Sequence, residues 1–343
     1  MEISVVLRNT TPVFSAAPGT SKITLDGKIN QPSSRYPLTR ARTMSVIADS
    51  GDGILKPVAL PVVPGNTMRN LLRRIMLKSV IEKALAPVGK LSISAYSAAY
   101  AGSANGTPDG LPSTFDEIVA QRNHLFIGLF GGGPRMLEGR LKVDTLYPIH
   151  KNAERVMGDG FEDRMVEGKI TDIVWTRRCD PIVNLGDDAD VEVIEGGADA
   201  ANGWIADLLA TTNANSAKRK KGEDAPEAEE ANSPRGLKAF NAHEVVIPGV
   251  NWLWRVSLDQ PTDAQVGLVL LAISKLPEYR IAGGHAKDYG AVEIEDVLLN
   301  GESVWSAGTL SDDVSDYLDQ MVEATDGIST ADFESFAASA KEA

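Results

Sequence analysis

The feature that most constrains the fold is a strand, helix, strand pattern that occurs twice along the chain. Residues 2–8 alternate and are rich in Val and Ile, which is typical of a strand. Met68, Leu72, Ile75 and Met76 then recur at helical spacing. In chain order the six segments are residues 2–8, 68–80, 141–145, 250–256, 262–275 and 291–297. This order is the split pattern of a ferredoxin-like domain, so the sequence predicts an α+β fold.

The segments between these elements are expected to be insertions. Residues 10–61 are rich in Gly, Pro, Ser and Arg without sustained periodicity, so we expect a long functional loop. Residues 92–116 turn to Ala, Ser, Gly and Tyr, which indicates an irregular insertion. A charged low-complexity tract makes residues 150–242 the least regular part. The predicted organisation is a domain over residues 1–300, with insertions at about 90–123 and within 150–242, and an acidic helical extension over 301–343.

The distribution of charge matters more than its sum. The 343 residues include 34 Lys and Arg against 47 Asp and Glu, a formal net charge of −13. Residues 1–100, however, carry 13 basic and 5 acidic side chains, whereas residues 301–343 carry one lysine and ten acidic ones. Because the local field steers a polyanion, this pattern favours a nucleic-acid-binding body with an acidic tail. A solvated amphipathic tail helix would give the same pattern.

Composition and motifs argue against several other classes of protein. No stretch approaches the roughly 20 apolar residues of a membrane span, and Met1–Arg8 is too short and charged for a secretory signal. Cys179 is the single cysteine, so no disulfide or Cys-based metal cluster is expected. Nucleotide-loop, H-E-x-x-H and G-x-S-x-G motifs do not occur, and the four histidines lack metal-ligand spacing. We expect a cytoplasmic protein without membrane contact, catalytic residues, metal or cofactor. Catalytic groups dispersed along the chain would leave no such motif.

Two local features suit phosphate binding. Arg69 and Arg73 lie four residues apart after a helix start that Asn66 or Thr67 can cap, so free backbone N–H groups and two guanidinium groups are available. The alternative is a solvated basic face of the helix.

The second feature is the glycine-rich segment Ile281–Gly290. Its glycines allow the backbone to approach a ligand, Lys287 supplies a cation, and Tyr289 supplies a plane for stacking. Glycines that join a helix to a strand are also common for purely structural reasons, and chemistry alone favours that alternative.

Four segments resemble one family when they are taken together and in this order. They are Val63–Arg73, with a Pro-Gly-small-small-hydrophobic-Arg helix start; Leu129–Gly131 with Gly139–Thr145, with a Phe-Gly and an Arg-x-x-Val-x-Asp strand; Glu244–Trp252, with a Pro-Gly before an aromatic strand; and Ile281–Gly290. The chain resembles the RAMP superfamily of CRISPR-associated proteins, in particular its Cas-seven-type backbone subunits. It is most similar to the backbone protein of type IV effectors, and next to that of type III.

This resemblance implies a modified RRM-like palm with large thumb-like and finger-like insertions, the thumb lying within residues 150–242. It further implies a filament of copies along one guide RNA (crRNA), bound to other CRISPR effector subunits, with the target nucleic acid recognised by base pairing. Most of the candidate RNA-binding residues follow from their position in the family, whereas Arg40, Arg42, Arg177 and Arg178 are added for their charge and location. They are Arg40, Arg42, Arg69, Arg73, Arg177, Arg178, Gly283, Gly284, His285 and Lys287.

Two further functions stay open on the sequence. An endoribonuclease of the same superfamily would cut with an aspartate such as Asp26, or with His285 and Tyr289 as acid and base. Type III subunits place their aspartate before the Pro-Gly helix, where this chain has the Arg- and Thr-rich Tyr36–Met44, so we expect no cleavage. The third possibility is an oligomerising structural protein whose basic body meets the acidic tail of a neighbour.

Overall fold

The computed structural model describes residues 1–49, 54–102, 114–134, 136–179, 195–197, 199–200, 202–204, 206–207, 210, 238–284 and 287–338. Internal contacts divide the chain into two compact units. The first unit consists of Met1–Ala17, Ala41–Asp172 and Val245–Ala343, and the second of Pro18–Arg40 and Ile173–Glu244. No helix in the described part of the chain is both long and apolar enough to span a bilayer.

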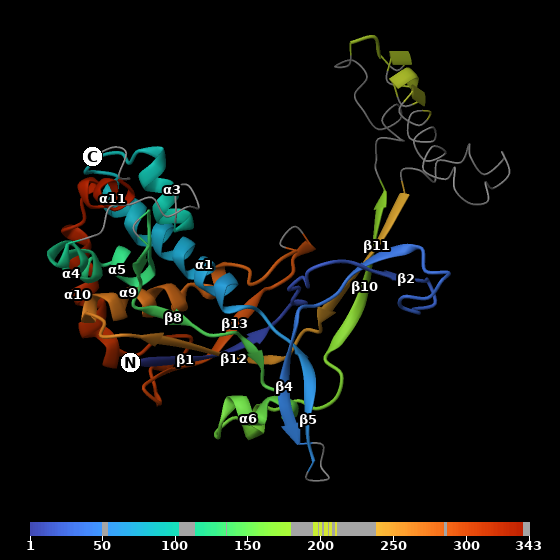
Figure 1. Ribbon diagram of the computed structural model, residues 1–343, viewed down its shortest axis with the longest axis horizontal. Coiled ribbons are helices and arrows are strands. Elements are labelled where there is room, and N and C mark those ends of the chain that lie inside the picture. The colour runs from blue at the N-terminus through green and yellow to red at the C-terminus, as the bar shows by residue number, and fades with distance from the viewer. Residues whose placement is uncertain are drawn as a thin grey trace. The chain divides into compact units, whose positions relative to one another are not determined.

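A central antiparallel sheet organises the first unit (Figure 1). Its four main strands are β1 (Glu2–Asn9), β8 (Leu141–Val143), β12 (Asn251–Leu258) and β13 (Val292–Leu299). They stand in the order β13-β1-β12-β8, and each neighbouring pair is antiparallel. Numbered along the chain, with a helix after the first and third strands, this is the order 4-1-3-2 of a split βαβ arrangement. The predicted α+β fold of ferredoxin-like order is confirmed.

Alternation along the central strands decides which side chains enter the core. Val5 of β1 pairs with Trp254 of β12, and Leu7 pairs with Trp252. All four side chains are fully buried in the main core, each contributing on the order of 1.5–3 kcal/mol. Because successive side chains of a strand point to opposite faces, Val6 lies on the other face and joins a second, smaller cluster.

Helices α1 (Gly65–Met76) and α9 (Asp263–Ser274) cover the face of the sheet that carries the main core (Figure 1). The first helix continues through a π-helical turn, η1 (Leu77–Ile81), into α2 (Glu82–Leu85). The predicted apolar stripe is confirmed, since its large members are buried: Met68, Leu72, Ile75, Met76 and Val80. The helix is therefore held by its apolar face, as most protein helices are.

The two helices begin differently. Thr262 and Gln265 form a reciprocal capping box at the start of α9. The expected cap of α1 at Asn66 or Thr67 is wrong, because the N-cap residue is Pro64 and no side chain caps this end. Gly65 lies so close to the carbonyl oxygen of Val143 on β8 that a Cβ atom there would overlap it, which fixes the helix start by backbone packing.

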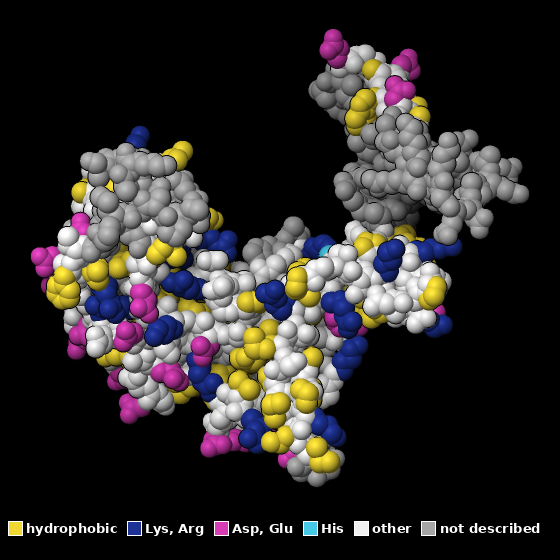
Figure 2. Space-filling model, viewed as in Figure 1, with side chains coloured by type: hydrophobic (Ala, Val, Ile, Leu, Met, Phe, Trp, Pro, Cys, Tyr) yellow, Lys and Arg dark blue, Asp and Glu magenta, His cyan; other side chains and the backbone are white. Residues whose placement is uncertain are grey.

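A β-hairpin packs against the opposite face of the sheet, so the long loop predicted over residues 10–61 is wrong. Strands β4 (Thr43–Asp49) and β5 (Leu55–Pro61) pair in antiparallel register. With the short helix α6 (Glu154–Met157) they enclose the second cluster around Val6. Exposed apolar side chains also line this hairpin, as Figure 2 shows at the bottom of its view: Met44, Ile47, Ile54 and Leu55.

The predicted insertion at about 90–123 is helical rather than irregular in its described part. It contains α3 (Ile93–Ala101) and α4 (Phe115–Asn123), and α5 (Ile127–Phe130) follows. The acidic C-terminal segment also forms helices, α10 (Ser315–Asp326) and α11 (Thr330–Ala337). These C-terminal helices belong to the first unit, because Met321, Phe333 and Phe336 are buried in its main core.

Short elements complete the first unit. They are β6 (Gly131–Gly132), β7 (Leu137–Glu138), β9 (Tyr147–Pro148), η2 (Lys151–Ala153), η3 (Glu162–Arg164), η8 (Leu276–Glu278), β14 (Glu302–Ser303), β15 (Trp305–Ser306), β16 (Thr309–Leu310) and η10 (Asp312–Val314).

The second unit is a four-stranded sheet with its own small core. Its order is β10 (Thr171–Cys179), β11 (Lys238–Val246), β3 (Tyr36–Thr39) and β2 (Ser21–Ile23). Ile23, Leu38 and Ala242 form the buried centre, and Tyr36 makes edge-to-face contacts with Trp175 and Phe240. The predicted strand at 170–179 is confirmed. The thumb expected within residues 150–242 stays a prediction, because most of residues 180–237 lie outside the described residues.

Candidate nucleic-acid interface

The glycine-rich segment forms a turn docked on the chain near residues 12–14. The backbone N–H of Gly283 donates to the carbonyl oxygen of Phe14 at 2.9 Å, and that of Gly290 donates to Pro12 at 2.8 Å. The N–H of Ile281 closes the turn on the carbonyl oxygen of Gly290 at 2.9 Å. The N–H groups of both Gly283 and Gly290 are thus already engaged inside the protein, which supports the structural explanation for these two glycines.

Close packing explains the glycine at 290. Its φ is +84°, and a Cβ atom there would overlap the carbonyl oxygen of Ile281. At Gly284, with φ +78°, a Cβ atom would lie 2.6 Å from the ring of Tyr289. That ring is only 7% exposed and packs edge-on against Phe14, and burial raises the pKa of Tyr289. The expectation that Tyr289 offers a free stacking plane is therefore wrong.

Lys287 is the predicted RNA contact of this segment that reaches the surface. Its side chain is exposed, while its backbone N–H donates to Gly284 at 2.8 Å. His285, a predicted RNA contact between Gly284 and Lys287, lies outside the described residues.

A groove of about 500 Å³, here called the α1 groove, opens beside this turn. Arg74 and Lys78 reach it from α1 and η1, Tyr100 from α3, and Tyr279 and Arg280 from the segment after η8. Its remaining lining residues are Leu71, Glu278 and Asp288. Arginine, lysine and tyrosine side chains around one concave surface are the combination that binds phosphates and bases together.

Pairing within the α1 groove leaves an excess of positive charge. Arg280 is neutralised by Asp288 at 2.8 Å, and Glu278 pairs with Lys275 at 3.5 Å. Arg74 and Lys78 form no ion pair with any described residue. Both charges are therefore available to a phosphate, and they are one helical turn apart.

The structure places the predicted pair Arg69 and Arg73 elsewhere. Arg73 is only 4% exposed, and its guanidinium lies over the ring of Phe130 at 4.8 Å. Arg69 donates a hydrogen bond to the carbonyl oxygen of Phe130. Burial, with a smaller effect from the charge of Arg69, lowers the pKa of Arg73 to about 10. Its buried position does not suit the predicted phosphate contact, so we leave Arg73 out of the α1 groove.

A sequence signal separates the two pairs of basic residues. At about 100° per residue, Arg69 and Arg73 fall beside Met76 and Val80 on the buried side of the helix. Arg74 and Lys78, which the sequence analysis did not select, fall on the opposite side. The wheel of the whole helix would have found them, whereas Tyr100, Tyr279 and Arg280 come from distant segments that only the fold brings together.

The remaining predicted arginines lie in other places. Arg40 belongs to the second unit, where it pairs with Glu244 at 3.3 Å and stays about half exposed. Arg42 is half-buried in the first unit, and its N–H donates to the carbonyl oxygen of Ser15 at 2.6 Å. Arg177 and Arg178 lie on β10, but their side chains are outside the described part of the chain.

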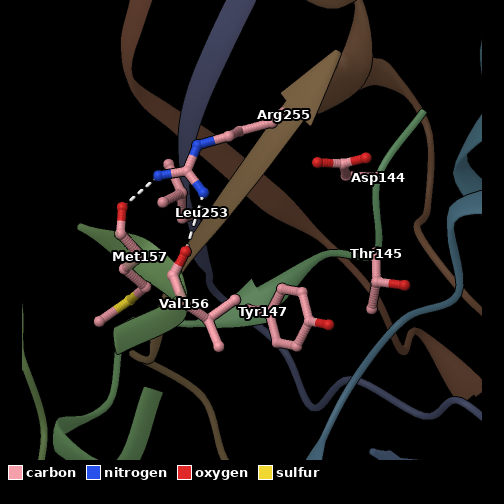
Figure 3. Close-up of a pocket in the computed structure, with 7 residues that line it drawn as sticks. All are labelled: Asp144, Thr145, Tyr147, Val156, Met157, Leu253 and Arg255. Atoms are coloured by element: carbon pink, nitrogen blue, oxygen red, sulfur yellow. Dashed lines mark hydrogen bonds between the residues drawn. The ribbon is translucent and has the colours of Figure 1, made fainter. Parts of the chain in front are cut away.

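A second pocket, of about 340 Å³, lies between β12, β9 and α6 (Figure 3). Arg255 dominates it, but its guanidinium donates to the carbonyl oxygens of Val156 (3.1 Å) and Met157 at the end of α6. Burial, followed by the charge of Asp144, raises the pKa of Tyr147, the pocket's phenol. With its cation committed to a helix end, this pocket suits an anion less well than the α1 groove does.

Comparison with known proteins adds one similarity. No family model and no curated protein matches the chain. Among solved structures, a chain of a structure described as a Type IV-B CRISPR complex is similar, with 13% identity and a TM-score of 0.47. The match covers 86% of this chain and 90% of that chain. A similarity at this level transfers no function.

Proposed function

We propose that this protein is a guide-RNA-binding, non-catalytic backbone subunit of a CRISPR effector ribonucleoprotein. In this function several copies polymerise along the spacer part of one crRNA in the cytoplasm, together with other effector subunits. The target nucleic acid is recognised by its pairing with the guide. Support comes from the four family-like segments in their family order along residues 63–290.

The observation that carries the proposal is the α1 groove. It places Arg74 and Lys78, which form no ion pair with a described residue, beside tyrosine side chains and next to the glycine-rich turn. Phosphate contacts made by such cations are independent of sequence, as a subunit that must accept any guide requires. Guide sequence would then be read by base pairing and not by protein side chains.

The endoribonuclease alternative finds less support among the described residues. Asp26 is an exposed side chain whose pKa is lowered by a hydrogen bond from Thr24 and then by one from Lys28. Tyr289 is buried with a raised pKa, and so does not suit proton transfer with His285. No three described His, Cys, Asp or Glu side chains gather where they could hold a metal ion.

The test is RNA binding by the full-length protein. We expect co-purified RNA to raise the ratio of absorbance at 260 nm to that at 280 nm. We also expect the affinity for single-stranded RNA to fall steeply between about 50 and about 200 mM salt. The double variant Arg74→Ala/Lys78→Ala should bind at least tenfold more weakly, by about 0.7 kcal/mol or more per lost contact. Lys83→Ala/Lys90→Ala removes two exposed lysines outside the groove and is the matched control.

Each outcome selects one function. Salt-independent affinity, or equal loss in both double variants, would overturn the groove as the RNA site. Discrete products from repeat RNA or complementary target RNA, lost in Asp26→Asn, would favour the endoribonuclease. A preparation free of RNA that binds none, yet assembles through its charged ends, would favour the structural protein.

A further inference from the structure

The α1 groove continues onto an aromatic surface of α3. Tyr96 and Tyr100 lie one turn apart on this helix, and their rings stack with centroids 6.1 Å apart and planes inclined by only 16°. Both side chains are more than a third exposed, at 37% and 38%. Large aromatic rings usually bury their faces. Two parallel rings at the surface therefore mark a place where a planar ligand can stack and cover them.

The two tyrosines differ in how they are held. The hydroxyl of Tyr96 donates to Glu82 at 2.8 Å, and this bond raises the pKa of Tyr96. Tyr96 therefore stays in place as a backing for its neighbour. Tyr100 has one face toward Tyr96 and also lines the α1 groove, where no described carboxylate pairs with Arg74 or Lys78. A flat group on Tyr100 would thus have cations beside it.

We propose that the α1 groove binds single-stranded nucleic acid by stacking one unpaired base on Tyr100, with the flanking phosphates on Arg74 and Lys78. Tyr96 is a positioning residue that holds the ring of Tyr100. Stacking needs a base that is free of a partner, whereas a duplex offers only phosphates to such a surface. Because every base has a π face, the contact is tolerant of sequence. This inference rests on the proposed function and names the state of the RNA that the groove accepts.

An acidic peptide is the other ligand with matching charge, including the acidic C-terminal segment of a second copy. The described geometry favours nucleic acid, since a carboxylate uses the cations but leaves the parallel tyrosines uncovered. The two ligands are separated by the test below.

The test measures the affinity of the full-length protein for three ligands. They are a single-stranded RNA of about 12 nucleotides, the same strand in a duplex, and an abasic strand that keeps every phosphate. A length of about 12 nucleotides is enough to span one binding site. Tyr100→Ala should weaken binding of the intact single strand about 5- to 150-fold, without changing its salt dependence. Tyr100→Phe keeps the ring and should bind as the wild type does. The abasic strand should bind equally to the wild type and to Tyr100→Ala.

Several results would overturn the inference while leaving the proposed function intact. They are salt-dependent RNA binding that is indifferent to Tyr100→Ala, or a duplex bound as tightly as the single strand. A wild-type protein that binds none of the RNA ligands would instead refute the proposed function. A poly-glutamate peptide serves as a competitor. If it displaces RNA equally well from the wild type and from Tyr100→Ala, the groove is assigned to an acidic peptide. A cooperative thermal unfolding transition of Tyr100→Ala, little below that of the wild type because the side chain is 38% exposed, shows that the variant is folded.

Discussion

The indole Nε1 of Trp252 donates a hydrogen bond to the side-chain oxygen of Asn9 at 3.0 Å. Asn9 is fully buried and also accepts from the backbone N–H of Val250, while its amide donates to the carbonyl oxygens of Thr11 and Ile247. All four hydrogen-bonding positions of this amide are thus filled. The residue joins the end of β1 to the turn that leads into β12, and so holds the two central strands of the sheet together.

Replacing Asn9 by Ala should therefore lower the free energy of unfolding by about 3–5 kcal/mol. The change leaves buried donors and acceptors without partners, each at about 1–3 kcal/mol. Urea unfolding measures the difference. Asn123→Ala removes an exposed amide that accepts one hydrogen bond, from Arg140 at 2.8 Å, and should cost no more than about 1 kcal/mol. Equal losses in the two variants would refute the importance of the buried network.

Gly290→Ala tests whether the glycine-rich turn depends on close backbone packing. Gly290 and Gly308 have nearly the same φ, +84° and +82°, but a Cβ atom overlaps the Ile281 carbonyl at Gly290 and meets nothing within 4 Å at Gly308. Gly308→Ala should cost only the backbone term, about 1–2 kcal/mol. Gly290→Ala should cost clearly more in thermal or urea unfolding. Similar costs would show that the turn relaxes and that packing does not require this glycine.

The sequence predicted the central fold well because its elements are amphipathic with a clear period. Val5 and Leu7 alternate with polar or second-face residues, and Met68, Leu72 and Ile75 follow helical spacing. The hairpin β4–β5 escaped prediction because its apolar residues do not alternate. Buried Val46 and Ala48 enclose an exposed Ile47.

Proline residues also made the second strand of this hairpin hard to predict from the sequence. Pro57 and Pro61 lie in β5, which among the described strands pairs with β4 alone and so tolerates residues without an N–H.

The candidate site was only partly predictable. Lys287 was selected because it stands beside glycines, and its contact with RNA stays a prediction. The basic character of α1 was evident from the sequence. Helical spacing alone separates Arg69 and Arg73 from Arg74 and Lys78, but the partner of the first pair, the ring of Phe130, comes from a distant segment. Tyr100 and Arg280 are 180 residues apart in sequence, so no local pattern could join them in one groove.

We expect His124 to make the stability of the first unit depend on pH. Its Nδ1 accepts hydrogen bonds from the N–H groups of Phe126 and Ile127, both at 3.1 Å, and its ring packs on Phe333 of α11. Burial lowers the pKa of His124, and the nearby carboxylate of Asp332 only partly opposes this effect. A proton on Nδ1 would also break both hydrogen bonds.

The folded state therefore binds this proton less well than the unfolded state. The stabilising effect of neutral His124 is complete above the ordinary pKa of about 6.5 and is lost as the pH falls from there through the lower folded value. His124→Asn keeps an acceptor but does not titrate. We expect the loss of thermal stability between about pH 7.5 and pH 5 to be smaller in this variant than in the wild type. Parallel profiles would contradict this role.

The buried charge of Arg73 should lower the free energy of unfolding of the wild-type protein. The pKa of Arg73, about 10, lies well below the ordinary value of an arginine. At neutral pH the group is therefore charged in both states, and its burial, with the smaller repulsion from Arg69, costs about 3 kcal/mol in full. That cost disappears only as the pH rises from about 10 to above 12. The cation–π contact with Phe130 offsets about 1–2 kcal/mol of this cost.

An apolar side chain of similar length should therefore be favourable at this position. We expect Arg73→Met to raise the free energy of unfolding by about 1–2 kcal/mol at neutral pH, measured in urea, because no described carboxylate pairs with Arg73. Arg73→Ala leaves a cavity beside Phe130 and should not show this gain. Lys83→Met changes an exposed charge and should stay within about 0.5 kcal/mol of the wild type. A less stable Arg73→Met would show that the guanidinium contact with Phe130 outweighs the cost of burying its charge.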